Sequence, residues 1–402
     1  MAPAAAGAAS EAMSGATLAE DAWRLAFGDL PVDQGLALRE STAWRHFPGH
    51  DPRRYAALLS VADIDAFLAT DAAARPRISM ADNSRPGSAA VPEAEYAFED
   101  GGADLPNLFA RFDAGATLVL SQFNQIHAPL ARFCRGLEQV FLHAVQANIY
   151  LTPPGAQGFR RHYDTHDVLV LQVQGRKDWR IWPGQPFPNP TRRTPWQGGV
   201  EPLAEAVEVV LEPGDALYVP RGVLHDAATQ DGEASLHITV GFMEPSFAAV
   251  LRLAVDLLEE SEPGLRAAFP TWRLAEGPGA LAALAQPLAA LLAGPEALDR
   301  TALALLDRLA ADQPPLLARG LFVNEPGLET KLRLAPGALH ALVPEPSGEG
   351  ASLRWAGAPL ALTNEEAGWV ERLADGATPA ALGAASLGFC RRLRRLGLLA
   401  EG

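Results

Sequence analysis

The sequence predicts an α+β protein in which an antiparallel barrel or jelly roll lies between two helical regions. Between about residues 147 and 241, apolar residues alternate with the period of two that is typical of strands, and turns containing Gly and Pro separate the segments. On both sides of this region the apolar residues follow the helical period instead. A chain of 402 residues is too long for one core of typical size, so two or three domains are expected.

The N-terminal region is predicted to be helical after a disordered tail. Residues 1–15 are small and rich in alanine, whereas 17–74 show a mostly helical pattern, in which Ser60–Asp63 has the residues of a capping box. The stretch 81–106 is rich in Pro, Gly and acidic residues, and we expect it to be an irregular connection.

The central region is predicted to begin with a strand at 117–120 and a helix at 130–145, whose apolar residues share one face. After this helix the apolar residues alternate with polar ones. The further strands are expected at 147–151, 167–174, 179–182, 208–211, 216–219 and 235–241.

A helical pattern returns at Ser246 and continues towards Pro314-Pro315, which is expected to stop it. An alanine-rich stretch at 280–293 joins two apolar stripes, which give more apolar surface than one helical layer buries. We therefore expect a homodimer built through 246–311, and an intramolecular helical bundle is the alternative. The stripes are Phe247, Val250, Leu251, Ala254, Leu257 and Leu258, and then Leu298, Ala302, Leu305, Leu306 and Leu309.

The tail from Gly320 mixes short strands and helices. Thr363–Glu366 is a capping box that opens a helix ending near Leu373, and 386–396 is expected to be the last helix. A cluster of arginines on that last helix is compatible with nucleic-acid binding, but the net charge of −15 opposes it, so we favour a solvated face that complements the helix dipole. The cluster consists of Arg391, Arg392, Arg394 and Arg395.

The composition, 48% hydrophobic and 20% charged, is typical of a globular protein. Residues 1–14 lack the basic start and apolar run of a signal peptide, and the longest apolar stretch, near 280–292, is too short to span a bilayer. Cys134 and Cys390 cannot build a disulfide framework or a thiolate zinc site. A cytoplasmic protein without membrane contact is the expectation.

The strongest chemical signal is an H-x-D motif, His162 and Asp164, with His225 further along the chain. On a strand the first two would share a face, and the turn–strand–turn pattern of 213–224 would bring His225 to the mouth of a barrel. Two histidines and one carboxylate suit non-haem Fe(II), because they leave coordination positions open. His166 would lie about 13 Å from His162 along a strand, so we assign it to the pocket wall or to support of the ligands.

Lys177 opens a strand directly after a turn. A buried lysine would need an anionic partner, such as the distal carboxylate of 2-oxoglutarate. Taken alone, however, its position among other charged residues favours a solvated turn lysine. The other polar candidates share strand faces, and either line the same pocket or make ordinary hydrogen bonds inside the barrel: Asn148 and Tyr150 on one strand, and Ser235, His237 and Thr239 on another.

Several runs resemble the JmjC-type ribosomal oxygenases, also called the cupin-4 family, which hydroxylate histidyl or arginyl residues of ribosomal proteins. They are QANIYLTPPGAQGF (146–159), HYDTHDV (162–168), LQVQGRKDW (171–179), GATLVL (115–120), the turn before His225, and SLHITVG (235–241).

The resemblance implies a double-stranded β-helix catalytic domain at 16–245, a helical dimerisation region at 246–315 and a winged-helix-like domain at 320–402, the last matched in pattern only. It also implies hydroxylation of a protein side chain with Fe(II) and the co-substrate 2-oxoglutarate, and a basic ribosomal protein as partner. The implied metal ligands are His162, Asp164 and His225, and the implied 2-oxoglutarate residues are Lys177, Asn148, Tyr150 and Ser235.

Three other interpretations stay open. The chain could be a tailoring hydroxylase of a short peptide or natural product, with the same chemistry on another substrate. It could be a catalytically silent adaptor that uses its winged helix, although an intact triad and Lys177 argue against this. It could also be a metal-dependent cupin that does without 2-oxoglutarate, which would need more histidine ligands and no Lys177.

Overall fold

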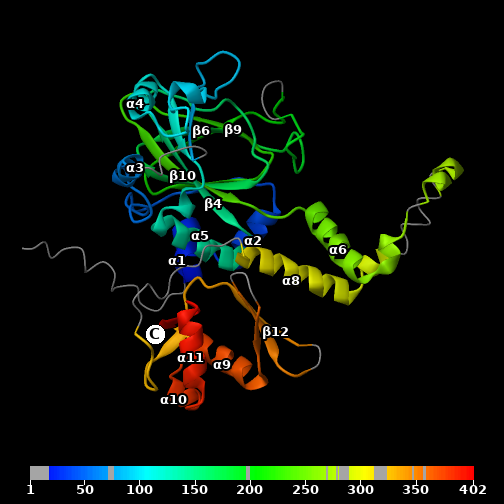
Figure 1. Ribbon diagram of the computed structural model, residues 1–402. Helices are drawn as coiled ribbons and strands as arrows, with labels where there is room; N and C mark the ends of the chain where they lie inside the picture. Colours follow the sequence, from blue (N-terminus) through cyan, green and yellow to red (C-terminus); the bar gives the residue numbers. More distant parts are fainter. Residues whose placement is uncertain are drawn as a thin grey trace, which may run out of the picture. The chain divides into compact units, whose positions relative to one another are not determined.

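The computed structural model describes residues 18–70, 77–195, 200–268, 270–277, 279, 289–311, 324–345, 348–355 and 359–402 (Figure 1). The tail 1–15, most of the alanine-rich stretch 280–293 and the Pro314-Pro315 stop lie outside the described residues. The chain divides into two compact units, one up to Met243 and one from Glu244. Within the described ranges, no helix is long and apolar enough to cross a membrane.

The first unit is built on two antiparallel sheets, one ordered β1-β8-β5-β10-β4-β3-β2 and one ordered β7-β6-β9. From β5 onward the chain passes between these sheets in the winding of a double-stranded β-helix, which confirms the predicted α+β jelly-roll core. The strands are β1 (Arg45–Phe47), β2 (Ile78–Ala81), β3 (Thr117–Leu120), β4 (Val145–Thr152), β5 (Asp167–Gln174), β6 (Lys177–Trp182), β7 (Val207–Leu211), β8 (Ala216–Val219), β9 (Leu224–Ala228) and β10 (Ser235–Phe242).

Helices pack on one face of the larger sheet, and the smaller sheet lies over the other. Because side chains alternate along β5, Leu169 and Leu171 join the core that includes the helices, whereas Val168 and Val170 pack with Trp179 of the smaller sheet. The interior of the barrel is therefore apolar where β5 faces the smaller sheet. The helices of this unit are α1 (Leu18–Phe27), α2 (Val32–Glu40), α3 (Val61–Leu68), α4 (Leu105–Asp113) and α5 (Ala128–Phe141), with short 3₁₀ turns η1 (Glu93–Glu95) and η2 (Phe123–Gln125).

The structure changes some element boundaries expected from sequence. The helix predicted to reach residue 145 ends at Phe141, because Leu142 takes a left-handed conformation with φ 53° and Val145 already belongs to β4. The region expected to be helical up to residue 74 contains β1, and β2 and β9 were not anticipated; these strands are defined by pairing with distant strands rather than by a local period. The capping box at Ser60 is confirmed.

The second unit contains two long helices and a small mixed domain with its own core. The capping box at Thr363 is confirmed, and Gly397 follows the last helix with φ 81°, as a C-terminal glycine should. Its elements are α6 (Phe247–Ser261), η3 (Pro263–Arg266), η4 (Thr271–Glu276), α8 (Pro295–Ala311), β11 (Leu332–Leu334), β12 (His340–Pro344), β13 (Ala351–Trp355), β14 (Leu360–Leu362), α9 (Asn364–Ala374), α10 (Pro379–Leu382), α11 (Ser386–Arg395) and β15 (Leu399–Glu401).

The apolar stripe on α6 divides between buried and exposed positions. Ala254 and Leu258 are buried, whereas Phe247 is 92% exposed and Leu251 is 52% exposed. On α8, Leu298 is 57% exposed. Exposed apolar side chains of this kind are typical of an interface, so the homodimer stays a proposal.

Each arginine of the cluster on α11 faces a carboxylate. Glu325 pairs with Arg391 and Arg395, and the other two arginines pair with Glu366 and Glu401. This compensation of charge supports the interpretation of a solvated face.

Candidate metal centre

The H-x-D motif lies in the segment between β4 and β5, and one pair of hydrogen bonds ties it to β9. The backbone amide of His162 donates to the carbonyl of His225 at 3.0 Å, and that of His225 donates back at 2.7 Å. The expectation that Asp164 also lies on a strand was wrong. Opposite Asp164 lies Gly222, which has φ 77° and belongs to the turn before β9 rather than to a strand. Its amide donates to the Asp164 carbonyl at 3.0 Å.

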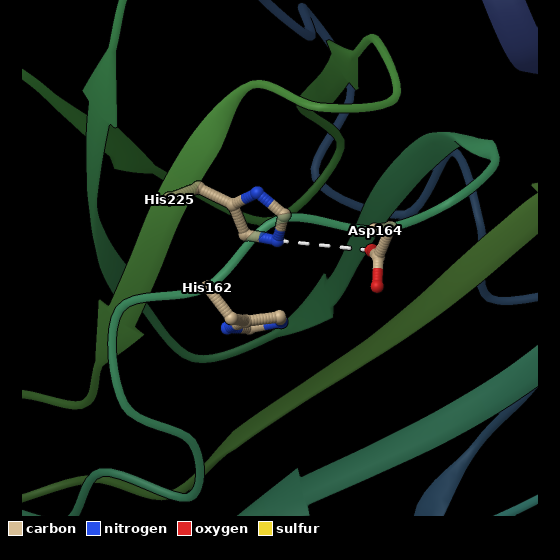
Figure 2. A group of neighbouring side chains, drawn as sticks. All are labelled: His162, Asp164 and His225. Atoms are coloured by element: carbon tan, nitrogen blue, oxygen red, sulfur yellow. Dashed lines mark ion pairs between the residues drawn. The ribbon is translucent and has the colours of Figure 1, made fainter. Parts of the chain in front are cut away.

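The side chains of His162, Asp164 and His225 converge. Figure 2 shows them pointing towards one another from two chain segments. One ligand atom from each lies within 4.8 Å of the others, and Nε2 of His225 is 3.8 Å from Oδ2 of Asp164. The sequence motif therefore marks residues that the fold brings together.

Backbone hydrogen bonds orient both imidazoles. Nδ1 of His162 lies 2.7 Å from the carbonyl oxygen of Arg160, and Nδ1 of His225 lies 3.0 Å from that of Val223. A carbonyl oxygen only accepts, so both Nδ1 atoms carry the proton and Nε2 keeps the lone pair that binds metal. Burial and the neighbouring His162 lower the pKa of His225 to about 4, which keeps it neutral. The donor set thus fits a divalent cation.

The three residues open into a cavity of about 140 Å³ inside the jelly roll. Asp164 is the one carboxylate, and Lys177 the one lysine or arginine, among the described residues that line it. The lining residues are Thr117, Tyr150, Gly158, Phe159, His162, Asp164, Val168, Val170, Lys177, Trp179, His225, Ala227, His237 and Thr239.

Lys177 is buried in this cavity with only 4% of its surface exposed, so its interpretation as a solvated turn lysine was wrong. As the first residue of β6 it points into the barrel, and its Nζ donates to Oγ1 of Thr152 at 2.9 Å. Burial lowers the pKa of Lys177 to about 7. A buried ammonium of this kind is stabilised by an anionic ligand.

Three further residues of the cavity wall, Tyr150, His237 and Thr239, were candidates from sequence. The rings of Tyr150 and His237 stack with centroids 4.9 Å apart at an angle of 3°. Burial and the charge of Lys177 lower the pKa of His237 well below its usual value, and burial raises that of Tyr150. Both are therefore neutral at physiological pH, and the Tyr150 hydroxyl keeps its proton.

Three candidates lie outside the lining. Oδ1 of Asn148 accepts from the amide of Gln122 at 2.8 Å, and Oγ of the buried Ser235 accepts from Gln172 at 2.9 Å. His166 packs against Gly241, where an added Cβ would lie 2.9 Å from its Nε2.

Thr152, the partner of Lys177, was missed by sequence reasoning. It follows Asn148 and Tyr150 in the alternation along β4, so extending that period by one step would have found it.

A model of the JmjC domain matches residues 119–250. Human ribosomal oxygenase 1 is 32% identical over 235 residues, which cover 55% of this chain and 35% of that protein. The bifunctional lysine-specific demethylase and histidyl-hydroxylase NO66 of Drosophila persimilis is 35% identical over 165 residues, which cover 40% of this chain and 23% of that protein. The chain thus spans about a third or less of these relatives' length.

Solved structures resemble the chain over more of its length. The ribosomal oxygenase YcfD of Escherichia coli, solved in complex with cobalt and 2-oxoglutarate, superimposes with a TM-score of 0.55, covers 92% of this chain and 96% of its own, and is 16% identical. At that identity the likeness shows the fold. The chain therefore contains a JmjC domain and is related in sequence to the ribosomal oxygenases.

Proposed function

We propose that this protein is an Fe(II)- and 2-oxoglutarate-dependent oxygenase that hydroxylates an amino-acid side chain of a protein. One observation carries the proposal: a convergent two-histidine, one-carboxylate group and a buried lysine line the same cavity. The first fits a metal with open coordination positions, and the second needs an anion. A dicarboxylate that binds the metal with one end and the lysine with the other satisfies both.

In this proposal the chain's residues bind and orient the metal and its co-substrate. His162, Asp164 and His225 hold Fe(II), and Lys177 holds the far carboxylate of 2-oxoglutarate by a charge-assisted hydrogen bond. The hydroxyl of Tyr150 keeps its proton and is available as a second donor. Bound Fe(II) and 2-oxoglutarate would supply the activation of O₂, and Val168, Val170 and Phe159 give the cavity an apolar part of its wall.

The cavity favours a histidyl over an arginyl target. A guanidinium stays charged at any physiological pH and requires a carboxylate when buried. Asp164, the one carboxylate among the described lining residues, is committed to the metal in this proposal. A neutral imidazole has no such need, and the aromatic walls of Phe159 and Trp179 suit a flat ring.

The experiment compares cells with and without the gene. Mass spectrometry of their ribosomal proteins should show one peptide heavier by a single oxygen atom only when the gene is present, and fragmentation should place that atom on histidine. A His162→Ala strain is the matched control. Ribosomal proteins without such a difference, together with succinate release on a short peptide, would favour the tailoring hydroxylase instead.

The regions outside the jelly roll remain proposals as well. We propose that 246–315 mediates homodimerisation and that 320–402 is a winged-helix-like domain. The exposed Phe247, Leu251 and Leu298 support the first. The helices and strands that surround one core between Leu332 and Leu399 support the second.

A further inference from the structure

The segments that carry Asp164 and His225 meet outside the regular ladders of the sheets. Asp164 precedes β5, and His225 is the second residue of β9, where it pairs with Ile181 of β6. Beyond the His162–His225 bridge, the amide of Gly222 donates to the Asp164 carbonyl, and the β5–β8 ladder ties the start of the turn to β5 through Val219 and Val168. The distance between these two candidate ligands therefore depends on how the turn is fixed against the start of β5.

Asp167 fixes that turn. Its Oδ1 accepts from the backbone amide of Arg221 at 2.9 Å and from the Arg221 Nε at 3.0 Å, and its Oδ2 accepts from the Tyr218 hydroxyl at 2.8 Å. Asp167 is 2% exposed. Burial alone would raise its pKa, but the hydrogen bonds from Arg221 hold the pKa below its usual value, so the carboxylate is charged.

A second arginine completes this buried charge cluster. Nη2 of Arg39, from α2, lies 3.5 Å from Oδ2 of Asp167, and both side chains are almost fully buried. The Arg39 guanidinium also lies 4.0 Å from the ring centroid of Phe242 and 4.6 Å from that of Phe141. Asp167 is thus anchored to the helical layer on one side while it holds the β8–β9 turn on the other.

We propose, resting on the proposed metal site, that Asp167 and Arg221 form a positioning clamp that sets the spacing of Asp164 and His225. The bridge at His162, the Gly222–Asp164 bond and the Asp167–Arg221 pair follow one another along the two segments. The ladders hold Val219 on β5 and His225 on β6 at the two ends of the turn, so without the last of these bonds the residues between them, Gly222 included, can shift against Asp164. Neither residue of the clamp lines the cavity, so their effect on the metal is indirect.

The experiment titrates the full-length protein with Co(II) in the absence of 2-oxoglutarate and follows the visible absorption of the metal. We expect Asp167→Asn and Arg221→Ala to bind Co(II) roughly tenfold or more weakly and with a changed spectrum, because groups that orient metal ligands affect affinity by about 10- to 100-fold. Arg221→Lys should recover part of the affinity, since its charge can still reach Asp167.

The chain offers a matched control at the opposite end of β8. Asp215 is also a buried carboxylate, and it accepts from the amides of Gly49 at 2.6 Å and Glu212 at 3.1 Å. Asp215→Asn should lower the melting temperature but leave Co(II) affinity and spectrum as in the parent. If Asp215→Asn weakened Co(II) binding as much as Asp167→Asn does, the cause would be a general loss of structure, and the clamp would be rejected.

The outcomes separate the clamp from the metal site. If His162→Ala loses Co(II) while Asp167→Asn and Arg221→Ala bind it like the parent, the metal site stands and the clamp is rejected. If the parent itself does not bind Co(II), the proposed function fails and the clamp with it. If Asp167→Asn does not fold, Arg221→Ala decides, because its side chain is partly exposed and its loss leaves Asp167 paired with Arg39.

Discussion

Replacing Lys177 by alanine should weaken binding of 2-oxoglutarate. The ammonium has three protons, and the described residues give it one acceptor, Oγ1 of Thr152 at 2.9 Å, which leaves two protons for a ligand carboxylate. A charge-assisted hydrogen bond contributes about 1.5–3 kcal/mol, which corresponds to roughly ten- to a hundred-fold in affinity. Isothermal titration with Mn(II) in place of Fe(II) measures this without turnover.

The same lysine predicts a pH dependence. Its pKa of about 7 means that above neutral pH the protein must take up a proton to bind the dianion. The affinity of the parent should therefore be flat below about pH 7 and then fall by up to about tenfold per pH unit. Lys177→Arg should abolish this dependence, because arginine stays protonated.

Arg176→Ala is the control for these experiments, because Arg176 is half exposed and pairs with Glu212 outside the cavity. It should bind 2-oxoglutarate like the parent. Undiminished affinity of Lys177→Ala, or a parent whose affinity does not change between about pH 6.5 and 9, would show that the anion binds elsewhere.

Burial of Lys177 should also lower the stability of the ligand-free protein. Its pKa falls from 10.5 to about 7 on folding, so the penalty is fully present below pH 7 and disappears as the pH rises towards 10.5. Lys177→Met should therefore raise the melting temperature most at pH 6.5, and the difference from the parent should shrink with rising pH. A difference that is constant with pH would contradict the argument.

Three other predictions concern the metal, the assembly and the packing. Asp164→Ala should abolish Co(II) binding and succinate release while circular dichroism is unchanged; near-parental turnover would reject the triad. Light scattering should give the parent twice its chain mass, and Phe247→Glu with Leu251→Glu a folded monomer; a monomeric parent would reject the dimer. Gly136→Ala should destabilise the protein by about 1–3 kcal/mol, because its Cβ would lie 2.4 Å from a backbone oxygen of α1. Gly368→Ala, whose Cβ would point into open space, should stabilise it by about 0.5–1 kcal/mol. Equal midpoints of denaturant unfolding for the two variants would contradict this prediction.

Local features of the fold could be predicted from the sequence because each depends on neighbours in the chain. The strand-like runs between Gly and Pro turns located β5 and β8 at the boundaries that the structure has, and the capping residues Ser60 and Thr363 marked the starts of α3 and α9. β1 and β9 were missed, because they exist through pairing with β8 and β6, and that pairing is not encoded in a local period.

The sequence by itself determined the types and spacing of the candidate ligands, since His162, Asp164 and His225 are recognisable as a donor set wherever they lie. Only the tertiary structure decided how they meet. Asp164 reaches the group from a loop held by Gly222, not from a strand. It also decided the character of Lys177: in sequence it resembles a solvated turn residue, but β6 directs it into a cavity, and burial there changes its charge and hence its chemistry.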